Sequence, residues 1–178
     1  MVSVTYLSYS YPDIEWEWDK INTTDIHFPS NFAWGTATAA HQVEGNNTNN
    51  NWHEWENSVD GNGVSRIHNN DRSGSAADHW NRYPEDIQLM RELGVNHYRF
   101  SIEWSKIEPA QGVFDQDALS HYRKKCEALI ESGITPVITL HHFSHPTWFE
   151  RLGAFEKEEN IGHFIKFSEI YKKSGKLS

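Results

Sequence analysis

The strongest constraint on the fold of this chain is the alternation of short apolar runs with segments of helical spacing. Apolar runs lie at 32–40, 95–102 and 134–140, and each has the length and composition of a buried strand. Helical periodicity follows the second run at 115–133 and the third at 161–175. Such alternation predicts a parallel sheet with right-handed crossovers, in an α/β fold. The pattern alone does not distinguish a closed barrel from an open sheet.

Three predicted helices each carry one apolar stripe. The helix at 115–133 is capped by Asp115 and stopped by Gly133, and an earlier helix is predicted to begin at Pro84 and to close at Gly94. The stripes, in chain order, are Ile87, Met90 and Leu93; then Leu119, Tyr122, Cys126, Leu129 and Ile130; then Ile161, Phe164, Ile165, Ser168 and Tyr171.

Two regions of the chain differ in character. Residues 1–27 show no sustained period and are predicted to be a poorly ordered extension, whereas 28–178 carries the apolar runs of the folded part. An asparagine-rich stretch at 46–52 and the Gly-Asn-Gly sequence at 61–63 mark a long polar loop after the first strand. A long loop at that end of a parallel sheet is typical of a binding face.

Charge and cysteine content restrict the partners and the compartment. The formal net charge is -9, from 25 acidic and 16 basic residues, which argues against nucleic acid or an anionic membrane surface as partner. Neither a signal peptide nor an apolar run long enough to span a membrane is recognisable. The single cysteine, Cys126, suits a reducing compartment, so the expected location is the cytoplasm.

Polar residues follow all three predicted strands. The first strand leads into His41–Gly45, the second contains His97, Arg99 and Ser101 on one parity, and the third ends at His141–His142. Ligands of parallel sheets bind at the carboxyl ends of the strands, so this convergence indicates a binding site. A guanidinium such as that of Arg99 inside a strand requires an anion or several acceptors, and a structural ion pair is the alternative.

No catalytic constellation is evident from spacing alone. The histidines after the third strand lack any metal-ligand spacing, so no metal is expected, and the absence of GxGxxG and P-loop motifs argues against a nucleotide cofactor. The candidate acidic residues are Glu44, Glu54, Glu56, Glu103 and Glu108. The sequence pairs no two of them at the separation that a glycosidase needs. Glu103 and Glu108 are interpreted as structural.

Three segments carry a resemblance to a known family. The runs FPSNFAWGTATAAHQVEG, ADHWNRYPEDIQLMRELGVNHYRFSIEWSKIEP and GITPVITLHHFSHPTWF occur in this order between about residues 28 and 167. They resemble successive signatures of glycoside hydrolase family 1, the β-glucosidase type. The resemblance implies a (β/α)₈ TIM barrel, of which this chain would supply the first three βα units and therefore remain incomplete.

The resemblance also implies the chemistry and the residues. The family performs retaining hydrolysis of β-glycosidic bonds with one glutamate as acid/base and another as nucleophile. Their Asn-Glu-Pro and Glu-Asn-Gly motifs are absent from this sequence. Gln42 and His142 match family residues that bind sugar hydroxyls, Arg99 matches the arginine that braces the nucleophile, and Phe143 stands where the family usually has tryptophan. Ser144 stands where aspartate is frequent, so the sugar wall is expected to differ locally.

These expectations lead to a β-glucosidase-like hydrolase whose isolated chain is inactive. The alternatives are a non-catalytic sugar-binding remnant and one half of a split enzyme, completed by a separately encoded C-terminal remainder of the barrel. A vestigial product without a stable fold is a further possibility. The expected ligand is a β-glucoside or a related sugar.

Overall fold

A three-stranded parallel sheet forms the centre of the computed structural model, which describes Tyr9, Thr24 and residues 27–174. The strands are β1 (Gly35–Thr38), β2 (His97–Ser101) and β3 (Thr135–Thr139), in the order β1-β2-β3. Gly35 pairs with His97, which pairs with Thr135, and both ladders are parallel. The predicted parallel α/β arrangement is therefore confirmed.

Helices connect the strands and continue beyond the third. The long ones are α4 (His79–Leu93), α6 (Gln116–Glu131) and α8 (Ile161–Ser174). The short ones are α2 (Ala40–Val43), α3 (Asn51–Glu56), α5 (Trp104–Ile107) and α7 (Thr147–Arg151), with single turns at His68–Asn70, Ala154–Glu156 and Glu158–Asn160. No helix within the described part of the chain is both long and apolar enough to cross a membrane.

The chain divides into two compact units, 1–32 and 33–178. In the first, the described residues include Phe28 and Phe32, whose ring centroids lie 4.8 Å apart. The extension at 1–27, predicted to be poorly ordered, lies almost wholly outside the described residues. The second unit contains every strand and long helix named above.

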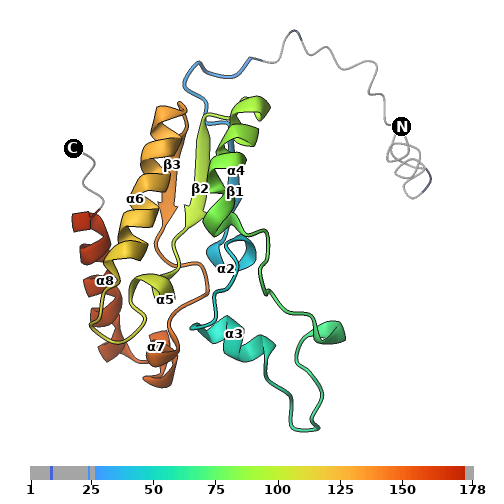
Figure 1. The fold of residues 1–178 in the computed structure, drawn as a ribbon, viewed down its shortest axis with the longest axis vertical. Coiled ribbons are helices and arrows are strands. Elements are labelled where there is room, and N and C mark those ends of the chain that lie inside the picture. The colour runs from blue at the N-terminus through green and yellow to red at the C-terminus, as the bar shows by residue number, and fades with distance from the viewer. Residues whose placement is uncertain (1–8, 10–23, 25–26, 175–178) are drawn as a thin grey trace. The chain divides into compact units, whose positions relative to one another are not determined.

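One face of the sheet is covered by α4 and α6 (Figure 1). The side chains of Tyr98 and Phe100 point to this face, and each is only 1% exposed. They pack against Ile87 of α4 and Leu119 of α6 within one apolar cluster. Burial of each large side chain contributes roughly 1.5–3 kcal/mol, so this layer supplies much of the stability.

A second part of the core lies around Trp104, at the carboxyl end of the sheet. Its indole stacks on the ring of Phe167 at 4.8 Å and lies 4.7 Å from that of Phe149. All three side chains are almost fully buried. The cluster fixes α5, α7 and α8 to one another below the strand ends.

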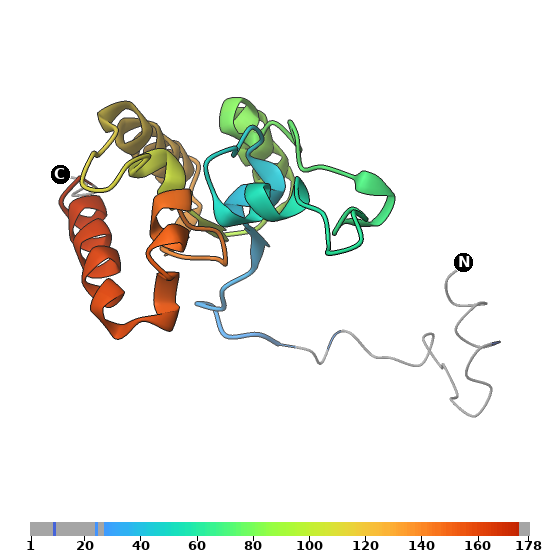
Figure 2. The ribbon, with the colours of Figure 1, turned by 90° about the horizontal axis from the view of Figure 1, so that it is seen from below.

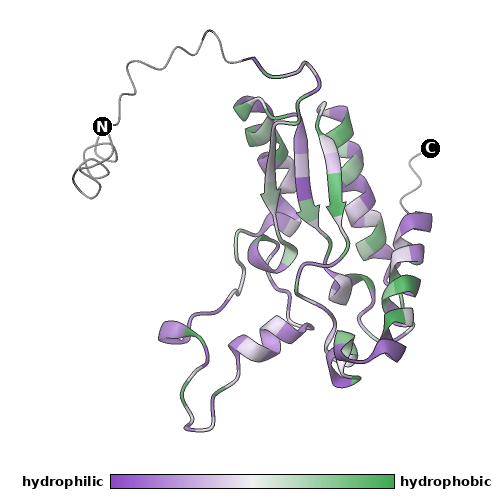
Figure 3. Ribbon diagram, turned by 180° about the vertical axis from the view of Figure 1, so that it is seen from behind, coloured by the Kyte–Doolittle hydropathy of each residue, from purple (hydrophilic) through white to green (hydrophobic). Residues whose placement is uncertain are grey.

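No helix of the described residues covers the opposite face of the sheet (Figure 3). Val137 on this face is 43% exposed, and Ala37 and Thr135 are exposed too. Parallel sheets are normally covered on both faces. The α4 and α6 layer therefore accounts for only one side of a complete fold.

Several helix predictions need correction. Pro84 lies inside α4, which begins at His79 rather than at the proline. The first turn is held because His79 is buried and because the Trp80 N–H donates to the Glu44 carbonyl. Leu93, which the spacing places on the buried stripe of α4, is 69% exposed.

In α8, the spacing likewise places Ile161 and Ile165 on the buried stripe, yet they are 45% and 52% exposed. The fully buried position is Phe167, because this face of the helix meets Trp104. The flank that carries the two isoleucines points away from that contact and lacks a covering layer among the described residues.

Candidate functional site

The carboxyl ends of the strands gather the polar segments that the sequence singles out (Figure 2). The helix α2 follows β1, α5 follows β2, and residues 141–146 follow β3. The Ala40 N–H donates to Ser101 Oγ at 2.7 Å, and the Ile102 N–H donates to the Thr139 carbonyl at 3.2 Å. These bonds hold the three strand ends in a fixed relation.

A buried polar brace lies beneath the loops. The Tyr122 hydroxyl donates to Glu44 Oε1 and accepts from the Glu103 N–H, each at 2.8 Å. Lys106 Nζ forms an ion pair with Glu44 Oε2 at 3.2 Å. Burial raises the pKa of Tyr122 well above its ordinary value, which keeps the hydroxyl protonated as a donor. The brace therefore connects the loop after β1 with the end of β2.

The candidate acidic residues of the sequence are engaged in structural contacts. Glu103 caps α5 and accepts from the Ser144 hydroxyl at 2.9 Å, and Glu108 accepts from the Trp104 indole N–H at 2.8 Å. Glu56 accepts from the Ser73 hydroxyl at 2.8 Å. Glu54 pairs with Arg151 at 2.9 Å. The structural interpretation of Glu103 and Glu108 agrees with these bonds.

Arg99 and His142 come together at the strand ends. Arg99 alternates with Tyr98 and Phe100 along β2, so it lies on the face without helices. Its Nη1 donates to His142 Nδ1 at 3.3 Å, and an arginine always carries its proton. A neutral imidazole that accepts at Nδ1 bears its proton at Nε2 and can donate it to a ligand.

The carboxylate partner of Arg99 is not found among the described residues, whose ion pairs do not include this side chain. An unneutralised guanidinium at the carboxyl end of a parallel sheet is a site for an anion. His97, which the sequence places with Arg99 on one parity, begins β2 instead and bonds Asn96 Oδ1 at 2.7 Å, so it lies at the other end of the strand.

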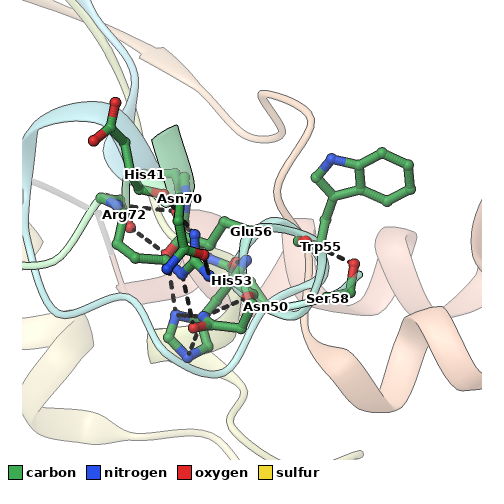
Figure 4. A network of polar contacts seen from close by, with 11 residues as sticks. His41, Asn50, His53, Trp55, Glu56, Ser58, Asn70 and Arg72 are labelled. Atoms are coloured by element: carbon green, nitrogen blue, oxygen red, sulfur yellow. Dashed lines mark hydrogen bonds and ion pairs between the residues drawn. The ribbon is translucent and has the colours of Figure 1, made fainter. Parts of the chain in front are cut away.

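Gln42 is exposed on α2, and its amide makes no hydrogen bond within the described part of the chain. The preceding His41 is held by Asn50 Nδ2 at 3.1 Å and lies 3.9 Å from Glu56 Oε2 (Figure 4). Burial lowers the pKa of His41, so its ring is neutral near pH 7. The network thus fixes the residue before Gln42 and leaves the amide available.

Phe143 is 68% exposed and has a positive φ of 67°. The Ser144 N–H donates back to the His142 carbonyl at 2.9 Å, which closes a tight turn around Phe143. Positive φ is unfavourable for an aromatic residue, and such strain concentrates at functional sites. The sequence identifies the position but not its strain.

His141, His145 and Glu150 form a row behind the turn. His141 Nε2 lies 3.4 Å from His145 Nδ1, and His145 Nε2 bonds Glu150 Oε2 at 2.6 Å. Burial, together with the neighbouring histidines, lowers the pKa of His141 to about 4. This ring is therefore neutral and serves to support the loop.

Sequence reasoning did not identify the exposed tryptophans Trp52 and Trp55 of α3, which are 43% and 48% exposed. With Phe143, Asn51 and Glu150 they line one hollow of about 400 Å³. The signal available was the Trp-x-x-Trp spacing in the loop after the first strand. On a short helix this spacing places both rings on neighbouring surface positions.

Known proteins of one family are similar to this chain over most of its length. The model of glycosyl hydrolase family 1 matches residues 24–176. β-Glucosidase A of Acetivibrio thermocellus is 37% identical over 154 residues, a match that covers 84% of this chain and 34% of that protein. The human cytosolic β-glucosidase is 33% identical, with 80% of this chain and 31% of that protein covered.

Solved structures give the same result. The β-glycosidase from Pyrococcus horikoshii superposes with a TM-score of 0.74 at 45% identity, and the family 1 β-glucosidase from Thermotoga maritima with 0.76 at 35%. Each match covers 83% of this chain and 33% of the other. The chain thus spans about a third of the length of these relatives. The predicted fold class, three βα units of a (β/α)₈ barrel that is incomplete in this chain, is confirmed.

Proposed function

Because this chain belongs to glycosyl hydrolase family 1, we propose that it is the sugar-binding N-terminal part of a β-glucosidase-type hydrolase. The observation that carries the proposal is the pair formed by Arg99 and His142, at the strand end where the ligands of parallel sheets bind. The reaction is retaining hydrolysis of a β-glycosidic bond. The names of the relatives, β-glucosidase and β-glycosidase, support this class.

The described side chains bind and orient the sugar. The Gln42 amide both donates to and accepts from hydroxyl groups, and His142 donates from Nε2. The exposed ring of Phe143 offers an apolar surface to the C–H face of the sugar. Arg99 has no carboxylate partner among the described residues, and in the proposal its guanidinium pairs with the carboxylate of the nucleophile.

In this proposal, the two glutamates that perform the reaction do not belong to this sequence. A retaining enzyme needs two carboxyl groups about 5–5.5 Å apart, one as nucleophile and one as acid/base. The candidate glutamates of this chain are buried or paired as described above, which makes them unsuitable. We therefore expect the isolated chain to bind sugar and not to hydrolyse it.

A split enzyme is the second candidate, favoured by the uncovered sheet. The exposed face around Val137 and the outer edges of β1 and β3 would be covered by the remaining strands of a barrel from a separately encoded chain.

Cys126 is buried and free, which suits a reducing compartment, so the cytoplasm is the proposed location.

The test is a pair of measurements on the purified chain. We expect methyl β-glucoside to perturb the His142 ring resonances, with the effect lost in Gln42→Ala, while p-nitrophenyl β-glucoside is not hydrolysed. Hydrolysis by the chain that disappears in Gln42→Ala would show that the glutamates are present after all. Absence of any sugar-dependent change would refute the binding site.

A further inference from the structure

A continuous row of buried hydrogen bonds runs behind the proposed sugar site, from the loop after β1 to the loop after β3. The Tyr122 hydroxyl joins Glu44 Oε1 to the Glu103 N–H, with a bond of 2.8 Å on each side. Glu103 Oε2 in turn accepts from the Ser144 hydroxyl at 2.9 Å. We call these residues the inner network: Glu44, Tyr122, Glu103 and Ser144.

One end of the inner network fixes the short helix that carries Gln42. Glu44 follows α2 directly, and its N–H donates to the Ala40 carbonyl at 2.9 Å, which closes the turn that contains Gln42. The start of α2 is fixed as well, because the Ala40 N–H donates to Ser101 Oγ at 2.7 Å. A helix of one turn that is held at both ends cannot rotate about its axis. The direction in which the Gln42 side chain leaves α2 is therefore set by these bonds.

The other end of the inner network fixes His142. The Ser144 N–H donates to the His142 carbonyl at 2.9 Å, while the hydroxyl of the same serine is held by Glu103. The imidazole of His142 accepts from Arg99 Nη1 at 3.3 Å. The backbone and the ring of His142 are thus both tied to β2 and the segment that follows it.

The inner network is buried and its carboxylates have partners. All of its members are at most 5% exposed. Glu44 also pairs with Lys106 at 3.2 Å, and Glu103 also accepts from the Ser105 hydroxyl at 2.7 Å. Apolar residues of similar volume often stabilise a core as well as buried charged groups do, whereas a satisfied polar network holds its members in one arrangement. Burial of two carboxylates behind a binding site therefore indicates a role in the geometry of that site.

We propose that the inner network is the positioning element of the sugar site, which holds Gln42 and His142 in a fixed relation so that both bind the same sugar ring. The proposal rests on the proposed function and adds residues to it. The members of the network are positioning residues, which act through Gln42 and His142 and do not touch the sugar. Binding side chains must be held within about 0.5 Å of their productive geometry, and a break anywhere in the network loosens that hold.

The experiment breaks the network at one end and observes the other. Ser144→Ala removes the hydroxyl that Glu103 accepts from, and the isotope-labelled chain is titrated with methyl β-glucoside while the Gln42 side-chain amide is observed. We expect this amide resonance to shift in the variant without sugar, and the affinity for methyl β-glucoside to fall about 2- to 10-fold, the range of one lost hydrogen bond. A change in stability alone leaves the resonance of the folded chain in place. Ser144→Thr keeps the hydroxyl and is expected to restore both values.

A second variant and a matched control complete the test. Tyr122→Phe interrupts the same network at its middle and is expected to give the same shift and the same loss of affinity. Ser168→Ala removes a comparable hydroxyl, which donates to the Phe164 carbonyl at 2.8 Å within α8 and outside the network. It is expected to change neither value. Near-ultraviolet circular dichroism verifies that each variant is folded.

A double-mutant cycle tests whether the effect passes through Gln42. If it does, Ser144→Ala costs less affinity in the Gln42→Ala background than in the unsubstituted chain, whereas independent residues give equal losses. Equal losses, or a Gln42 amide that is unchanged in both network variants of a chain that binds methyl β-glucoside, overturn this proposal alone. No binding of the sugar by the unsubstituted chain overturns the proposed function and this proposal with it.

Discussion

A buried lysine makes the stability of this fold depend on alkaline pH. Lys125 of α6 is 2% exposed, and its ammonium lies 3.9 Å from the ring centroid of Phe100 and 5.5 Å from that of Tyr98. Burial lowers the pKa of Lys125 from 10.5 to about 8, and the nearby Glu44 opposes this effect. A tenfold change in an acid dissociation constant corresponds to about 1.4 kcal/mol, so the charged form costs the fold about 3 kcal/mol.

The sign of the pH dependence follows from the lowered pKa. Between pH 8 and 10.5 the unfolded chain retains the proton of Lys125 more than the folded chain does, so the free energy of unfolding contributed by this group rises with pH. Below pH 8 both states are charged and the full cost is present. Attraction of the ammonium to the two rings offsets about 1–2 kcal/mol of that cost.

We therefore expect Lys125→Met to raise the free energy of unfolding by about 1–2 kcal/mol at pH 7 and by almost nothing at pH 10.5. Urea titrations from pH 7 to 10.5, followed by the intrinsic tryptophan fluorescence to which the buried Trp104 contributes, measure this difference. The raised pKa of Tyr98, about 12, affects both proteins equally and cancels. Lys124→Met, at an exposed neighbouring position, is the control. A variant that is less stable at pH 7, or a difference independent of pH, would refute the reasoning.

Three further changes test other parts of the structure. Tyr122→Phe removes the hydroxyl that connects two loops, and it is expected to lower the free energy of unfolding by about 2 kcal/mol in urea titration, because buried partners are left unsatisfied. Gly45→Ala brings a Cβ within 2.2 Å of the Ser75 carbonyl oxygen at a φ of 83°, so a loss of about 3 kcal/mol is expected by the same assay. Phe143→Asn places at the positive φ a residue that tolerates it, so about 1 kcal/mol of added stability is expected in the same urea titration. The same change is expected to weaken sugar binding in a calorimetric titration. Lower stability would contradict the assignment of strain.

Much of the fold follows from the sequence because local patterns determine it. Helix α6 begins after the Asp115 cap and ends near Gly133, as its flanking residues predict, although Ile130 of its predicted stripe is 48% exposed. The start of α4 could not be predicted, because contacts with the loop after β1 hold its first turn despite Pro84. The exposure of Leu93 could not be predicted either. Helical spacing indicates which residues share a stripe but not where the layer that covers the stripe ends.

The members of the candidate site are a prediction from the sequence, and the structure supplies their geometry. Gln42, Arg99 and His142 were identified through the family resemblance, and the structure adds the bond between the last two. The strained turn at Phe143 and the hollow with Trp52 depend on contacts between segments about ninety residues apart, such as Asn51 with Phe143. No local pattern in the sequence encodes such contacts.

Whether this chain carries the sugar-binding part of the family site is decided by titrating the isotope-labelled chain with methyl β-glucoside, observed at the Gln42 side-chain amide and the His142 ring. We predict saturable shifts of both signals at one common affinity, with Arg99 nearby responding through its bond to His142. Signal changes confined to other residues, or none at millimolar sugar, would contradict the assignment of sugar binding to these side chains.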